Sequence, residues 1–154
     1  MHTEAPAAPN AHQAKQAEQA HVAPGAVYRH TLRVYWEDTD AGGVVFYANY
    51  LKFFERARTE WLRHLGVGQQ ALRAATGAIF VVTHTSVQYR APARLDDMLD
   101  VTVLLRQRGA ASMTIAQQAW RGAMLLAEGE IRIGCVDEAS FRPRRIPTEL
   151  TMLL

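Results

Sequence analysis

Cysteine and lysine are both scarce in this sequence. Cys135 is the single cysteine in 154 residues. No disulfide can therefore form within the chain, and nothing points to an oxidising compartment. Lysine occurs only as Lys15 and Lys52, so arginine carries most of the positive charge. The formal net charge of +2 is far from the clustered basic surface of nucleic-acid-binding proteins, and we exclude nucleic acid as a partner.

Long apolar runs are absent as well. No stretch approaches the roughly 20 apolar residues that a membrane-spanning helix needs, so we predict no membrane span. The first residues lack the basic-then-apolar pattern of a secretory signal. We therefore expect a cytoplasmic protein.

Several kinds of catalytic or ligand-binding motif are also missing. No two of the six histidines have the spacing of metal ligands, and no cysteine lies near them, so no metal site is predicted. The G-x-S-x-G motif of serine hydrolases and the glycine-rich fingerprints of nucleotide-binding loops do not occur. Cys135 lies on the apolar face of a predicted strand, so we interpret it as a small buried core residue.

The chain divides by composition into two parts. Residues 1–26 consist mostly of Ala, Gln, Pro and His, and Val22 is their only branched aliphatic residue. Such a segment has little apolar surface to offset the entropy of ordering it, so we predict a disordered tail. Residues 27–154 have the length and composition of a single folded domain.

One long amphipathic helix dominates the folded part. It follows a predicted strand over residues 30–36, in which Leu32, Val34 and Trp36 share one face. Its apolar stripe recurs every three or four residues and is widened by Phe53 and Leu62. The stripe consists of Tyr50, Phe54, Ala57, Trp61 and Leu65. A second, shorter helix is predicted over residues 69–75.

From Ile79 onward the apolar residues alternate, which predicts strands. We expect Ile79, Val81, Val87 and Tyr89 to share one face of the first of them. Three more strands follow, over residues 101–109, 113–120 and 125–135, and in the last of them we expect Leu125 to share one face with Ile131 and Ile133. A helical turn over residues 147–153 ends the chain. Strands in direct succession favour an antiparallel sheet. The fold class is therefore α+β, a five-stranded antiparallel sheet wrapped around one central helix.

The loop between the first strand and the long helix carries the most distinctive chemistry. Asp38 and Asp40 precede Gly42 and Gly43, which let the backbone approach a ligand closely. The free amides of the first helical turn, near Tyr47, can receive a developing negative oxygen. A carboxylate beside such amides suits hydrolysis of an activated acyl group. Turn and capping chemistry alone would explain the same residues.

The loop resembles a family signature. Residues 34–50, VYWEDTDAGGVVFYANY, are similar to that of the 4-hydroxybenzoyl-CoA thioesterase family, and most of all to its Tol–Pal-associated YbgC-type branch. Three further motifs match in the same order and spacing. They are residues 54–60 (FERARTE), 89–97 (YRAPARLDD) and 135–137 (CVD).

The resemblance implies a hotdog fold, a homodimer or homotetramer with active sites between subunits, an acyl-CoA substrate and no cofactor. It places the catalytic carboxylate on Asp40 and the amide that polarises the thioester carbonyl on Tyr47. The same loop implies substrate contacts by Gly42, Gly43, Val44 and Phe46, with the Phe46 and Tyr47 rings narrowing the acyl pocket. Arg90 is a candidate for binding the coenzyme A phosphates, with Arg56, Arg58 and Arg94 as alternatives.

Alternatives remain at this stage. Asp38 and the helical Glu55 are the other candidate carboxylates, although Asp38 suits a hydrogen-bonding role in the loop. The chain could instead bind acyl carrier protein or Tol–Pal envelope partners, with hydrolysis incidental. A hotdog dehydratase is a third possibility, but such enzymes rely on a histidine with a helical carboxylate.

Overall fold

A computed structural model describes residues 25–154. The predicted tail over residues 1–26 lies almost entirely outside this part. The described elements are β1 (Tyr28–Arg33), a 3-10 turn (Trp36–Asp38), α2 (Asn49–His64), α3 (Gln69–Thr76), β2 (Ala78–Tyr89), β3 (Met98–Arg108), β4 (Ser112–Arg121), β5 (Met124–Asp137) and α4 (Thr148–Thr151). Their order confirms the predicted sequence of strands and helices.

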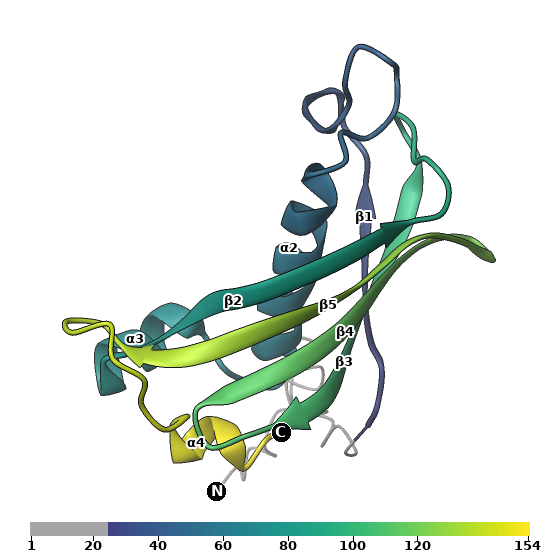
Figure 1. Cartoon of the computed structure of the whole chain (residues 1–154). Coiled ribbons are helices and arrows are strands. Elements are labelled where there is room, and N and C mark those ends of the chain that lie inside the picture. Colours follow the sequence, from purple (N-terminus) through teal and green to yellow (C-terminus); the bar gives the residue numbers. More distant parts are fainter. Residues whose placement is uncertain (1–24) are drawn as a thin grey trace, which may run out of the picture.

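The strands form one sheet in the order β1-β3-β4-β5-β2, and every neighbouring pair is antiparallel. The long helix α2 lies against one face of this sheet (Figure 1). Both β1 and β2 are edge strands, so each leaves one side without a strand partner among residues 25–154. The α+β prediction, with five antiparallel strands around one long helix, is confirmed.

The predicted helical stripe is the centre of the core. Phe53, Phe54 and Ala57 are fully buried, and Tyr50, Trp61 and Leu62 nearly so. The Phe54 ring lies against Gly129 of β5, where an added Cβ atom would come within 2.5 Å of the Ser86 carbonyl oxygen and 3.4 Å of the ring. Glycine in this strand therefore allows close packing of helix on sheet.

Three predictions about side-chain direction are wrong. Trp36 does not continue β1 on the core face. The strand ends at Arg33, the chain turns through residues 36–38, and the Trp36 side chain is 78% exposed. The Asp38 carboxylate favours this turn because it accepts a hydrogen bond from the Tyr35 amide at 2.8 Å.

The other two errors come from β-bulges, in which one extra residue reverses the alternation of faces. In β2 the register shifts between Val82 and His84. Before the bulge, Phe80 and Val82 therefore face α2 and line a hollow beside it. Beyond the bulge, Val87 occupies this same face. Ile79 and Val81 lie on the opposite face, so they do not share a face with Val87. In β5 a second shift, opposite Ala119 and Trp120, buries Leu126 in place of Leu125.

Candidate active site

The loop between β1 and α2 forms a small hairpin at the end of the sheet where β2 ends and β3 begins (Figure 1). Thr39 pairs with Val45, and the Asp40 amide donates to the Val44 carbonyl at 2.9 Å. Gly43 closes the turn with a φ of +73°, a conformation that favours glycine. The Val45 amide donates to the Ala93 carbonyl at 2.8 Å, which joins the hairpin to the chain after β2.

The Asp40 carboxylate is exposed at the tip of this hairpin. Its Oδ1 accepts a hydrogen bond from the Gly42 amide at 2.8 Å, and Oδ2 accepts none from residues 25–154. A Cβ atom at position 42 would lie only 3.0 Å from Oδ1, so glycine leaves room for this geometry. The Asp40 carboxylate is therefore oriented by one hydrogen bond and is still accessible to a substrate.

Asp38 has a different environment, because its side chain is only 6% exposed. Its Oδ2 accepts from the Tyr35 amide, and its Oδ1 accepts from the Asn49 side-chain amide at 2.9 Å. Its backbone carbonyl accepts from the Phe46 amide at 2.9 Å. Asp38 therefore ties the 3-10 turn to the start of α2, which agrees with the hydrogen-bonding role expected from the sequence.

The start of α2 offers a free amide. Asn49 N–H donates to the Phe46 carbonyl at 2.8 Å and Leu51 N–H to the Ala48 carbonyl at 3.1 Å. The Tyr47 N–H has no hydrogen-bond partner among the described residues, and no side chain caps the helix. Unpaired amides at a helix N-terminus attract negative charge.

An open pocket of about 290 Å³ lies beside this amide. It is lined by Val45, Tyr47, Tyr50, Tyr89, Arg90, Ala91 and Pro92. The Phe46 and Tyr47 rings lie 4.8 Å apart, and their side chains are 46% and 63% exposed. The two aromatic residues therefore stand at the accessible surface of the site. Tyr89, for which no role in the site was predicted, lines the same pocket and lies 42 residues beyond Tyr47 in the sequence.

Arg90 lines the aromatic pocket, but its guanidinium group is already engaged. It donates to the Glu128 carboxylate at 2.6 and 3.1 Å and to the Gln88 side chain at 2.7 Å. The alternative Arg58 donates to the Gln117 side chain at 2.8 Å from within the fold. Of these two arginines, Arg90 is the one beside the pocket, and its role toward phosphate stays a prediction.

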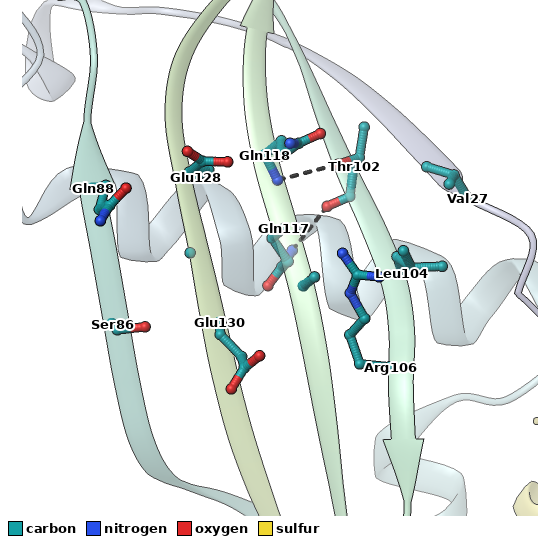
Figure 2. A pocket seen from close by; sticks show the side chains of 12 residues that line it. Val27, Ser86, Gln88, Thr102, Leu104, Arg106, Gln117, Gln118, Glu128 and Glu130 are labelled. Carbon is teal, nitrogen blue, oxygen red and sulfur yellow. Dashed lines mark hydrogen bonds between the residues drawn. The ribbon is translucent and has the colours of Figure 1, made fainter.

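A hollow of about 360 Å³ lies away from these residues, on the sheet face opposite α2. Figure 2 shows α2 behind the strands and the polar side chains gathered across them. Among its lining residues are Ser86, Gln88, Thr102, Gln118, Glu128 and Glu130. No residue of the Asp40 hairpin contributes to it. Glu128 and Gln88, which hold Arg90, are shared between this hollow and the neighbourhood of the aromatic pocket.

The described part of the chain holds no group of three or more His, Cys, Asp or Glu residues that could bind a metal ion. Over the same residues, no helix has both the length and the apolar character needed to cross a membrane. Cys135 is buried, as its strand pattern indicates.

Replacing Asp38 by alanine is expected to lower the free energy of unfolding by about 1–3 kcal/mol, because the Tyr35 amide and the Asn49 side chain lose a buried acceptor. Urea unfolding of the purified variant measures this loss. Glu37→Ala provides the comparison, since Glu37 is exposed and makes no hydrogen bond to residues 25–154. Equal stability of the two variants would contradict the bridging role of Asp38.

The amino-acid sequence matches a known protein family. Residues 34–153 match the model of the thioesterase-like superfamily. The acyl-CoA thioester hydrolase YbgC of Escherichia coli O6:H1 is 46% identical over 125 residues, which cover 80% of this chain and 92% of the relative. The acyl-CoA thioesterase YbgC of Haemophilus influenzae is 41% identical and covers 77% of this chain and 88% of its own.

A solved structure agrees. The probable thioesterase of Bartonella henselae superposes with a TM-score of 0.76 at 32% identity, covering 79% of this chain and all of its own. The predicted hotdog fold and family are therefore confirmed. The chain belongs to the thioesterase-like superfamily and is a homologue of the YbgC acyl-CoA thioester hydrolases.

Proposed function

We propose that this chain hydrolyses acyl-CoA thioesters, with Asp40 as the catalytic carboxylate and the Tyr47 amide as the donor to the thioester carbonyl oxygen. The observation that carries the proposal is the pairing of two unlike groups in one loop. An accessible carboxylate lies on a hairpin whose other strand leads directly into a helix N-terminus with an unpaired N–H. The two YbgC relatives named above are acyl-CoA thioesterases.

The Tyr47 amide and the Asp40 carboxylate have different roles in the reaction. As the carbonyl carbon becomes tetrahedral, negative charge develops on its oxygen, and the Tyr47 N–H stabilises that charge. Asp40 supplies the electrons in one of two ways. It attacks the carbonyl carbon, expels the CoA thiolate and forms an anhydride that water then cleaves, or it removes a proton from a water molecule that attacks instead. Both routes need the ionised carboxylate and no cofactor.

The remaining residues of the loop shape the site. Gly42 donates to the Asp40 carboxylate, and the turn at Gly43 directs the chain back past it. Val44 is half-buried and pairs with Arg94, while Phe46 exposes its ring beside Tyr47. Tyr47 lines the aromatic pocket and the Phe46 ring packs against the Tyr47 ring, which supports a role for both rings in narrowing the acyl pocket.

Purified protein should release CoA thiol from at least one member of a panel of short, long and aromatic acyl-CoAs. A thiol reagent measures the rate continuously, and the ranking of the panel gives the acyl preference. If folded protein released no thiol from any member, the proposed function would be wrong.

Assembly and partners follow from the same proposal. The free side of edge strand β2 can pair with a second copy and extend the sheet, which supports a homodimer, or a homotetramer of two such dimers. Binding to acyl carrier protein or to Tol–Pal envelope partners, and a cytoplasmic location, stay predictions. Sedimentation of the purified chain measures its assembly directly.

A further inference from the structure

Tyr89 links the end of β2 to the turn that carries the unpaired amide. Its phenol donates a hydrogen bond to the Tyr47 carbonyl oxygen at 2.8 Å. Within residues 25–154 this is the only hydrogen bond that the main chain of Tyr47 makes. The Phe46 carbonyl, in the same peptide group as the Tyr47 N–H, accepts from the Asn49 amide, and the following peptide group is held by a side chain 42 positions further along the sequence.

The Tyr89 ring is itself held by aromatic neighbours. It packs edge-on against Tyr50, with ring centroids 5.5 Å apart, and lies nearly perpendicular to the Tyr47 ring at 6.3 Å. Tyr50 belongs to the buried stripe of α2, and its phenol oxygen accepts a hydrogen bond from the Ala93 amide at 3.2 Å. Tyr89 is thus fixed to the rigid core on one side and to the Tyr47 carbonyl on the other.

The phenol is suited to act as a permanent donor. Partial burial raises the pKa of Tyr89 above its ordinary value, and the nearby Tyr47 phenol raises this pKa further. The O–H therefore stays protonated at neutral pH and continues to donate.

Two anchors bracket the Tyr47 amide. On its N-terminal side the Phe46 amide is held by the Asp38 carbonyl at 2.9 Å. On its C-terminal side the Tyr47 carbonyl is held by Tyr89. With both neighbouring peptide groups fixed, the N–H between them points in one direction, and a preorganised donor costs no reorganisation when the oxyanion forms.

We propose that Tyr89 is a positioning residue that fixes the direction of the Tyr47 amide through its phenol. This inference rests on the proposed function and deepens it, because it assigns the oxyanion donor a support that lies outside the hairpin. Tyr89 acts through Tyr47 and takes no part in bond making.

Replacing Tyr89 by phenylalanine removes only the hydroxyl group and leaves the ring contacts. We expect kcat on the best acyl-CoA to fall about tenfold, since misplacing a catalytic group by even 1 Å can cost up to about 10²-fold. The KM should stay within about twofold, because substrate binding before the reaction needs no oxyanion donor. Thiol release at varied substrate concentration gives both constants.

Tyr28→Phe is the matched control. The Tyr28 ring packs against His64 at 5.3 Å, and its phenol makes no hydrogen bond to the described residues. This variant should keep parental kcat. Thermal unfolding of both variants separates the alternatives, because a purely structural role of Tyr89 would lower the unfolding midpoint and leave kcat of the folded enzyme unchanged.

The outcomes distinguish this inference from the proposed function. A tenfold lower kcat with unchanged KM in Tyr89→Phe, alongside an inactive Asp40→Asn, supports both. Parental kcat in Tyr89→Phe, or a change in KM alone, overturns the positioning role while an inactive Asp40→Asn keeps the proposed function standing. Parental activity in Asp40→Asn overturns the catalytic role of Asp40 in the proposed function, and the absence of thiol release by the folded parent protein overturns the function itself.

Discussion

Replacing Asp40 by asparagine is expected to lower kcat for acyl-CoA hydrolysis by about 10²- to 10⁴-fold, the range typical of losing a catalytic carboxylate. Asparagine keeps the size of the side chain and can still accept the Gly42 amide, which now donates to Oδ1 at 2.8 Å. What it loses is the negative charge needed to attack the carbonyl carbon or to deprotonate water. The fold should therefore persist while turnover stops.

Glu37→Gln isolates this effect. Glu37 lies three residues before Asp40, is exposed and makes no hydrogen bond to residues 25–154. Removing its charge changes the local electrostatics by a similar amount without touching the hairpin. Parental kcat in Glu37→Gln and a large loss in Asp40→Asn assign the charge requirement to Asp40. A comparable loss of kcat in both variants would show that any negative charge in the loop contributes and that Asp40 has no special role.

The second large effect concerns stability. Replacing Phe54 by alanine is expected to lower the free energy of unfolding by about 3–5 kcal/mol, the usual cost of removing a buried phenylalanine ring. The Phe54 side chain is fully buried where α2 packs on the sheet, next to Gly129. The Gln117 side chain donates to the Phe54 carbonyl at 3.0 Å, which holds the backbone in place and limits collapse into the cavity.

Urea unfolding measures this loss against Leu51→Ala. Leu51 belongs to the same helix, but its side chain is 42% exposed, so its removal should cost less than about 1 kcal/mol. If Phe54→Ala lost no more stability than Leu51→Ala, the position of the core along α2 would be wrong.

The helical period of the sequence explains why this core could be predicted. Apolar residues recur every three or four positions from Tyr50 to Leu65, and the structure buries this stripe against the sheet as far as Trp61, with Leu65 partly buried. Strand faces were harder, because a bulge adds a residue without any change in composition. Thr83, at the bulge of β2, is an ordinary strand residue, and nothing around it marks a reversal of faces.

The candidate site also contains residues that could be predicted from the sequence and one that could not. Asp38, Asp40 and the glycines are adjacent in sequence, so local chemistry and family resemblance single them out together. Tyr89 reaches the site only because β2 ends beside the start of α2. The motif over residues 89–97 includes Tyr89, but a contact that depends on tertiary structure leaves no local pattern from which it could be predicted.

The central claim is that Asp40, rather than another carboxylate near the helix, performs the hydrolysis. Glu55 is the strongest rival, but its carboxylate accepts a hydrogen bond from Thr59 at 2.7 Å and lines a different hollow, with Arg58 and Trp61. The most direct test measures kcat/KM of Asp40→Asn and Glu55→Gln on the same acyl-CoA. We predict a loss of at least about 10²-fold in Asp40→Asn and less than about threefold in Glu55→Gln. The reverse order would contradict the assignment of Asp40.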